Sequence, residues 1–130
     1  MSNKTTPTGE MAVRVLAMPA DTNPAGDIFG GWVLSQMDIA GGIVTARATK
    51  GRTVTVAIDS MTFHKPVLVG DTLCCYVEVK KIGKSSITVH IESWVRRQFE
   101  DEGRVLVTEG VFTYVAVTND RIPRAIPKES

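Results

Sequence analysis

The chain has 130 residues, of which 43% are hydrophobic and 22% charged, and its formal net charge is +1. This composition indicates one globular domain with one core, and it argues against a disordered chain or a clearly basic nucleic-acid-binding protein. The polar start has no apolar signal segment, and no apolar run approaches the roughly 20 residues of a membrane span. Cys74 and Cys75 are adjacent, so we expect no disulfide framework and a reducing, cytoplasmic location.

We predict a single domain over residues 8–120, flanked by a loose leader at 1–7 and a polar C-terminal surface tail at 121–130. Residues 11–18 form a short apolar run that Pro19 closes, which predicts the first strand.

A loop rich in Asp, Asn, Pro and Gly follows, and then one long apolar segment predicts a helix from Gly30 or Gly31 to about Thr49. Gly51 fits a left-handed residue that caps the end of this helix. Because the helix is apolar nearly all round, we expect the rest of the fold to wrap it.

The remainder of the chain alternates like strand, at residues 53–63, 73–80, 87–96 and 105–117, with a hairpin at Gly83-Lys84. The order β-α-β-β-β-β predicts an α+β fold, in which one long central helix is wrapped by a curved antiparallel sheet. The last four strands are expected to run mostly as a meander. A single sheet leaves apolar surface to cover, so we expect a homodimer at least.

Asp38 is the one acid of the predicted helix. The residues three, four and seven positions away share its face, and they include Gly31, Ser35, Gly41 and Gly42. Glycines inside a helix cost about 1 kcal/mol each, so this small-residue face indicates a need for close packing or ligand access. The structural alternative is that Asp38 caps a neighbour or pairs with a basic residue at an interface.

The helix start offers amide N–H groups without helical partners, which can hold an oxyanion at Gly31. On their own, Gly30 and Gly31 are as well explained by a turn. Asn23 before Pro24 is either a turn residue or an amide that orients a water or a carbonyl.

Other site types have little support in the sequence. Nucleotide-binding glycine motifs and the nucleophile elbow are absent, and His64 and His90 lack metal-ligand spacing, so we expect no metal site. His90 is expected to be exposed. A basic group is expected around the hairpin serines, either as a solvated strand edge or as a phosphate site: Lys80, Lys81, Lys84, Arg96 and Arg97.

Four segments together resemble the hotdog-fold acyl-CoA thioesterases, in particular their bacterial YciA-like branch. The main one is Asn23-x-x-Gly26-Asp27-x-Phe29-Gly30-Gly31-Trp32-x-x-x-x-Met37-Asp38-x-Ala40-Gly41. The others are Phe63-x-Lys65-Pro66-x-x-x-Gly70-Asp71, Gly83-x-Ser85-Ser86 and Phe112-Thr113, so the resemblance spans residues 11–127.

This resemblance implies a hotdog fold and hydrolysis of acyl-CoA thioesters to a fatty acid and CoA, with short to medium acyl chains. It gives Asp38 the role of general base or nucleophile, and the Gly31 N–H that of polarising the carbonyl. Asn23 would act opposite Asp38 from the partner subunit of a dimer, and dimers would assemble into a hexamer as a trimer of dimers. The nucleotide end of CoA would lie at Gly83, Lys84, Ser85 and Ser86, with help from Arg124 and Lys128.

The resemblance implies no cofactor, since CoA is part of the substrate, and no nucleic-acid or membrane partner. A hotdog dehydratase would need a histidine beside the helix, and this helix carries Asp38 instead. The alternative function is a non-catalytic module that binds CoA or an acyl chain, in which Asp38 is structural.

Overall fold

The computed structural model describes residues 4–98 and 103–128. Its strands and helices follow the predicted order. They are β1 (Glu10–Leu16), the short 3-10 helix η1 (Pro19–Asp21), α1 (Gly30–Thr49), β2 (Thr53–Phe63), β3 (Thr72–Ile82), β4 (Ser86–Arg96) and β5 (Arg104–Ala116). Neither helix is long and apolar enough to cross a membrane.

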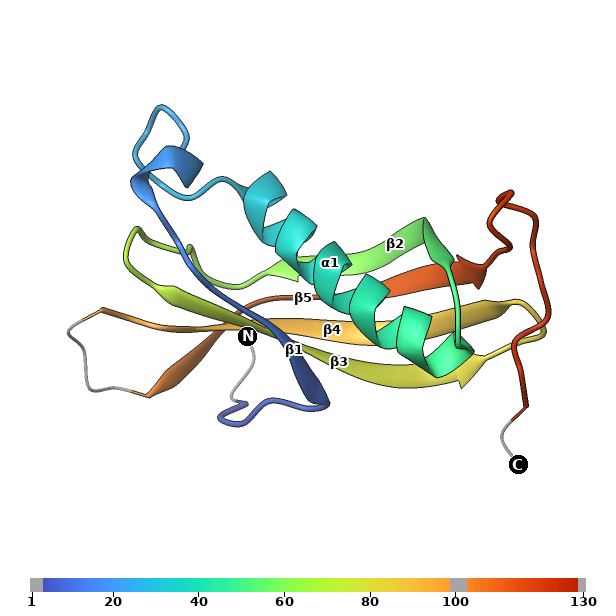
Figure 1. Ribbon diagram of the computed structural model, residues 1–130. Helices are drawn as coiled ribbons and strands as arrows, with labels where there is room; N and C mark the ends of the chain where they lie inside the picture. Colours follow the sequence, from blue (N-terminus) through green and yellow to red (C-terminus); the bar gives the residue numbers. More distant parts are fainter. Residues whose placement is uncertain (1–3, 99–102, 129–130) are drawn as a thin grey trace.

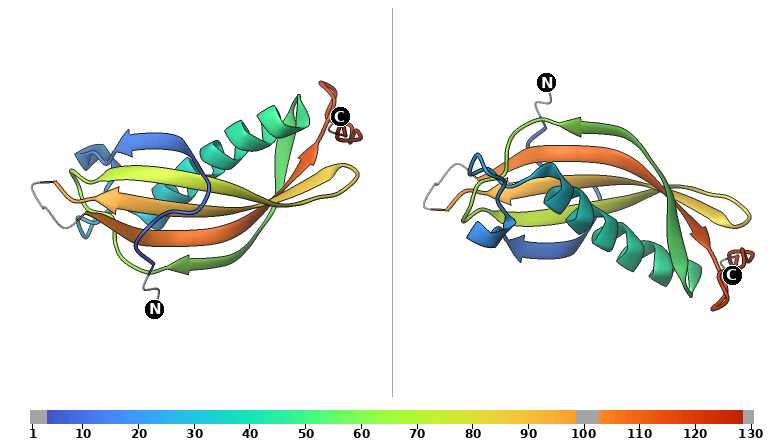
Figure 2. Two further views of the ribbon diagram at one scale, coloured as in Figure 1. Left: turned by 90° about the horizontal axis from the view of Figure 1, so that it is seen from below. Right: turned by 90° about the horizontal axis from the view of Figure 1, so that it is seen from above.

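The five strands form one antiparallel sheet in the order β1-β3-β4-β5-β2, and α1 lies along one face of it (Figures 1 and 2). The α+β prediction is therefore confirmed. β3, β4 and β5 are the expected meander, whereas β2 lies at the far edge and pairs with β5. The connection over residues 64–71 is long enough for the chain to return to β3 on the other side of the meander.

The core lies between α1 and the sheet. Met37 and Ala40 of α1 are fully buried, as are Leu73, Ile91 and Phe112 on three strands. The other side of α1 stays open, because Ile39 is 51% and Ile43 46% exposed. The helix that the sequence describes as apolar all round is thus only half covered by its own chain.

The helix end differs from the prediction. Lys50, with φ 57°, takes the left-handed position, so the expectation for Gly51 was wrong. Gly51 instead lets Arg124 approach, since a Cβ there would lie 2.5 Å from its guanidinium. That guanidinium donates to the Thr49 carbonyl oxygen over 2.9 Å. Arg124 therefore satisfies the end of α1, where the last carbonyls lack helical partners.

Both ends of the described chain are tied to the sheet more firmly than expected. Lys4 Nζ lies 2.5 Å from Glu92 Oε2, and the Thr8 amide donates to Glu92 Oε1 over 3.0 Å. At the other end, Ile126 is buried and its amide donates to the Lys84 carbonyl oxygen over 2.7 Å. Lys4 and Ile126 thus contact the rest of the fold from within the segments that the sequence predicts as a leader and a surface tail.

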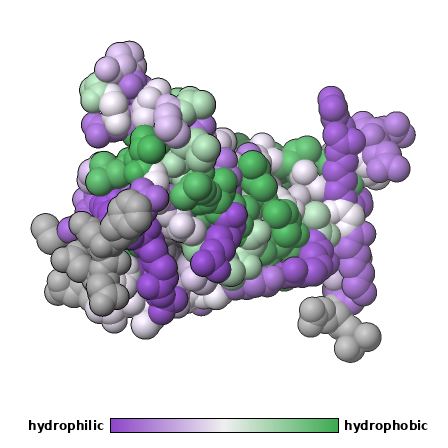
Figure 3. Space-filling view, turned by 60° about the vertical axis from the view of Figure 1, so that its left-hand side comes forward, coloured by the Kyte–Doolittle hydropathy of each residue, from purple (hydrophilic) through white to green (hydrophobic). Residues whose placement is uncertain are grey.

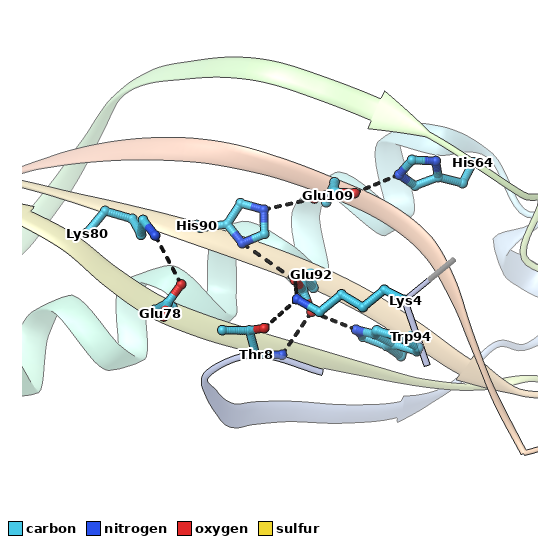
Figure 4. Close-up of polar contacts among 9 residues, drawn as sticks. All are labelled: Lys4, Thr8, His64, Glu78, Lys80, His90, Glu92, Trp94 and Glu109. Carbon is cyan, nitrogen blue, oxygen red and sulfur yellow. Dashed lines mark hydrogen bonds and ion pairs between the residues drawn. The ribbon is translucent and has the colours of Figure 1, made fainter. Parts of the chain in front are cut away.

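A polar network covers the face of the sheet that is turned away from α1 (Figure 4). Glu109 lies between two histidines, 2.7 Å from His64 Nε2 and 3.0 Å from His90 Nε2. The fully buried Glu92 accepts from the indole N–H of Trp94 over 2.9 Å. His90 is therefore part of a network rather than exposed, and the two histidines, far apart in sequence, meet at one carboxylate.

Acid should weaken the protein through Glu109. Burial by itself raises the pKa of this carboxyl, but hydrogen bonds to His64 and His90 outweigh it and hold the pKa below its ordinary 4.5. A depressed folded-state pKa contributes stability above the unfolded value, and this stability is lost as pH falls through the lower folded value. When Tm is measured from pH 6 downward, it should fall below about pH 4.5, and this fall in Tm should be smaller in Glu109→Gln. Equal losses in both proteins would contradict this role.

Candidate functional site

Asp38 lies at the middle of α1, half-buried, and its carboxylate is held from the sheet. Asp38 Oδ1 accepts from the Thr55 hydroxyl of β2 over 2.7 Å and from the Tyr114 phenol of β5 over 2.8 Å. No hydrogen bond within residues 4–98 and 103–128 engages Oδ2. One oxygen thus fixes the carboxylate, and the other is available to a water or a substrate.

Tyr114 is a dependable donor to Asp38. Burial raises the pKa of the phenol, and the hydrogen bond to Asp38 and the negative charge of Asp38 raise it further. The phenol therefore keeps its proton at physiological pH. Phe112 fixes the ring from the same strand, with ring centroids 6.5 Å apart and planes 13° from parallel.

The two helical glycines beside Asp38 have different surroundings. A Cβ on Gly41 would lie 2.1 Å from the Tyr114 hydroxyl and 2.9 Å from Ile91 Cδ1, whereas a Cβ on Gly42 would meet nothing within 4 Å. Gly41 is therefore required for α1 to approach β5 closely enough for the Tyr114 contact. Gly42 leaves open space on the helix surface.

Gly31 lies two turns before Asp38, in the first turn of α1. The N-cap residue Phe29 makes no side-chain capping bond, and the first amides of a helix have no partner within it. These amides carry the positive end of the helix dipole, so this end of the helix can hold a negatively charged oxygen.

Asn23 forms a turn in the single chain. Its Oδ1 accepts from the amides of Ala25 and Asp27, over 3.0 and 3.1 Å. Among the described residues, no hydrogen bond joins it to Asp38, so one chain by itself does not bring these two predicted site residues together.

The β3–β4 hairpin carries the predicted CoA-binding residues. Gly83 and Lys84 line a hollow of about 740 Å³ together with Ile126 and Lys128. Ser85 and Ser86 belong to the same hairpin, and the Gly83 amide donates to the Ser86 carbonyl oxygen over 2.7 Å. Lys84 and Lys128 thus line the same hollow. The β3–β4 hairpin lies near the C-terminal end of α1 (Figure 1).

The predicted basic group around this hairpin is divided. Arg96 pairs with Thr72, at the end of β3 opposite the hairpin, so Arg96 and Arg97 are not part of it. Arg97 forms an ion pair with the buried Asp71 and also donates to the Pro66 carbonyl oxygen over 3.1 Å. Arg124 is engaged at the end of α1, which leaves Lys84 and Lys128 as the cations of the hollow.

One further cluster has the right groups for a cation. His90, Glu92 and Glu109 offer ligand atoms within 4.8 Å of one another. The Lys4 ammonium already lies against Glu92, and the Thr8 amide and the Trp94 indole also donate to it. The oxygens of Glu92 are thus used by protein donors, and we assign the cluster to the stability of the sheet.

Sequence reasoning missed Thr55 and Tyr114. In the sequence, Tyr114 is one of several alternating residues of the last strand, and Thr55 is an ordinary strand threonine. Only the pairing of Thr55 with Tyr114 across β2 and β5 places both hydroxyls beside Asp38. The signal that existed was Gly41, since a helical glycine one turn from a carboxylate indicates a close neighbour.

The chain is similar to known proteins over most of its length. Residues 25–98 match the family model described as "Thioesterase superfamily". The chain is 51% identical over 124 residues to the acyl-CoA thioester hydrolase YciA of Salmonella typhimurium, covering 94% of this chain and 93% of the relative. It is 48% identical over 125 residues to the YciA protein of Escherichia coli K12, covering 95% of each.

Two solved structures are similar over nearly the whole chain. A hexameric broad specificity acyl-coenzyme A thioesterase superposes with a TM-score of 0.91 at 48% identity, covering 98% of this chain and 88% of that one. The hexameric thioesterase y2039 from Yersinia pestis superposes with a TM-score of 0.89 at 54% identity, covering 95% and 100%. The chain therefore belongs to the thioesterase superfamily and, within it, to the acyl-CoA thioester hydrolases related to YciA.

Proposed function

We propose that Asp38 performs the chemistry of acyl-CoA thioester hydrolysis in this chain. The observation that carries this role is the carboxylate itself, fixed through Oδ1 by Thr55 and Tyr114 with Oδ2 left available. The similarity to acyl-CoA thioester hydrolases supports the choice of reaction.

In this proposal, the thioester carbonyl oxygen accepts a hydrogen bond from the Gly31 amide at the start of α1. Asp38 either removes a proton from a water that attacks the carbonyl carbon, or attacks that carbon directly. The negative charge that develops on the carbonyl oxygen is stabilised by the helix start. In the first route the C–S bond then breaks, CoA leaves as its thiolate and takes up the proton from Asp38, and the acyl group is released as the carboxylic acid. In the second route the acyl group stays on Asp38 as a mixed anhydride when the C–S bond breaks, and a water then hydrolyses this anhydride, so that its hydroxyl goes to the acid and its proton to the thiolate.

The reaction proposed here uses no metal and no cofactor other than the CoA of the substrate. The hairpin hollow with Lys84 and Lys128 suits the phosphates of the nucleotide end, because lysine ammonium groups bind phosphate as point charges. We infer a preference for short to medium acyl chains. We also infer a reducing, cytoplasmic location, and the two free cysteines support this location.

We further infer that the working unit is a homodimer within a hexamer, and that Asn23 of one subunit completes the site of the other. Hydrophobic surface is left open on the face drawn in Figure 3. On α1 and the edge strand β2, the exposed hydrophobic side chains include Ile39, Ile43, Val56 and Ile58. Apolar surface of this kind marks an interaction site, and related structures are described as hexameric.

Val56→Asp should therefore disrupt the oligomer. A charge on the exposed edge strand would have to be buried against the partner, which is costly without a counter-charge. Light scattering coupled to size-exclusion chromatography should show smaller species. Ile122→Asp is the matched control, because Ile122 is 59% exposed in the C-terminal turn outside this surface. An unchanged mass for Val56→Asp would contradict the assignment of β2 to the interface.

The test of the function is hydrolysis of a panel of acyl-CoA thioesters from short to long chains, followed by thiol release. The expected result is turnover with a maximum at short to medium chains. The competing function is a non-catalytic CoA or acyl-chain binding module. Tight CoA binding in calorimetry together with no turnover on any chain length would favour that module and reject the hydrolase.

Tyr114→Phe should lower kcat by about tenfold while KM changes little. The substitution removes one hydrogen bond to a charged group, which contributes about 1.5–3 kcal/mol, and leaves Asp38 held by Thr55 alone. Steady-state kinetics on the best acyl-CoA measures the split between kcat and KM. Tyr76→Phe provides the control, since Tyr76 lies on β3, outside this site. A kcat equal to that of the wild type would show that Tyr114 does not position Asp38.

A further inference from the structure

Three arginines from three different strands line one hollow of about 250 Å³: Arg14, Arg96 and Arg104. Cys74, Tyr76 and Trp94 form much of the remaining wall. Cys75 packs in the core against α1, so its neighbour Cys74 faces the opposite side of the sheet. The hollow is therefore on the far side of the sheet from Asp38 and is separate from the site described above.

The strand register concentrates these positive charges. Arg96 lies directly opposite Arg104 across β4 and β5, and Arg14 lies opposite Cys74 across β1 and β3. Like charges directly opposite each other destabilise a sheet. Within the part of the chain that the structure describes, no ion pair or hydrogen bond engages any of the three guanidinium groups.

The three charges line the same hollow as Cys74. Burial raises the pKa of the Cys74 thiol, and Arg14, Arg96 and Arg104 all act against this rise. All three guanidinium groups are thus close enough to Cys74 to act on it together. An anion placed over Cys74 would be attracted by all of them at once.

The wall beside these charges is well fixed. Trp94 is 1% exposed, and its indole N–H donates to the buried Glu92. The negative charge of Glu92 is balanced by the Lys4 ammonium at 2.5 Å, so it opposes an anion in the hollow only weakly. Glu10, the acid of β1, is paired with Arg47.

We propose that this hollow binds a small polyanion of the diphosphate class, either inorganic pyrophosphate or a nucleoside diphosphate. Arg14, Arg96 and Arg104 donate to the phosphate oxygens, since the guanidinium fork matches phosphate geometry and keeps its charge. Tyr76, which is only half-buried, is the aromatic side chain of the hollow that a nucleobase would contact. Bound diphosphate would relieve the repulsion between Arg96 and Arg104.

The binding test uses the intact protein and the fluorescence of Trp94. The chain has two tryptophans, so Trp32→Phe leaves Trp94 as the only one. Inorganic pyrophosphate and ADP are titrated separately, with sodium chloride holding the ionic strength constant. We expect a saturable change in Trp94 fluorescence with pyrophosphate. Tighter binding of ADP than of pyrophosphate would identify a nucleoside diphosphate as the ligand. If Trp32→Phe does not fold, the rise in Tm of the wild type with each ligand measures the same binding.

Arg96→Gln and Arg104→Gln should each weaken diphosphate binding at least tenfold, while Arg52→Gln, an exposed arginine outside the hollow, should not. The same two substitutions should raise the Tm of the ligand-free protein, because each removes a repelling charge. If the role of the arginines were purely structural, the same substitutions would lower the Tm of the ligand-free protein. A lower ligand-free Tm in both variants would mean that an acid of the protein already pairs with these arginines, and the proposal would be wrong. Equal binding by all three variants would also overturn it.

Discussion

Asp38→Asn is expected to lower the turnover of acyl-CoA by about a hundredfold or more, because it removes the base or nucleophile of the reaction. The amide is nearly the same size as the carboxylate. Its oxygen can still accept from Thr55 and Tyr114, so the position of the side chain and the contact between α1 and the sheet should remain. The loss should therefore fall on kcat, and the affinity for CoA should stay close to that of the wild type.

Three measurements separate this result from a folding defect. Thiol release gives kcat, calorimetry gives the affinity for CoA, and thermal unfolding gives Tm. Asp120→Asn is the matched control, since Asp120 is an exposed acid in the C-terminal turn and should keep full activity. Full turnover in Asp38→Asn would falsify the catalytic role. Lost turnover with a strongly lowered Tm would instead make Asp38 a structural residue, which is the role it has in the binding-module alternative.

The sequence was sufficient for the features that are local in the chain. The extent of α1 follows from one apolar segment bounded by Gly30 and Lys50, and Asp38 is conspicuous as its single acid. The strands follow from alternation, although the place of β2 beside β5 does not. Strand alternation gives the two faces of each strand but does not say which strand is its neighbour.

The features that were missed depend on that neighbour relationship. Arg96 and Lys84 are close in sequence, but an eleven-residue strand carries Arg96 to the opposite end of the sheet. His64 and His90 are distant in sequence, and the antiparallel pairing brings both to Glu109. The partners of Asp38 were missed for the same physical reason, because hydroxyls from β2 and β5 meet only when the sheet has formed.

Gly41→Ala is expected to destabilise the fold and inactivate the site together. The new methyl group would lie 2.1 Å from the Tyr114 hydroxyl and 2.9 Å from Ile91 Cδ1, so either α1 or Tyr114 must move. Overpacking of a core typically costs about 1–3 kcal/mol, and the gain in helix propensity of up to about 1 kcal/mol offsets only part of it. Thermal unfolding should show a Tm lower by roughly 5 °C or more, and kcat should fall because Tyr114 no longer holds Asp38.

Gly42→Ala is a closely matched control, since it makes the same chemical change one position along the same helix. Its methyl group meets nothing within 4 Å among the described residues, so within one subunit only the gain in helix propensity applies and Tm should stay equal or rise. The double variant Gly41→Ala with Tyr114→Phe removes the hydroxyl that collides, and it should recover part of the Tm lost by Gly41→Ala. Such non-additivity is the signature of two residues in direct contact. Because the recovered protein still lacks the phenol that orients Asp38, its kcat should remain low, which separates the packing role of Gly41 from the positioning role of Tyr114.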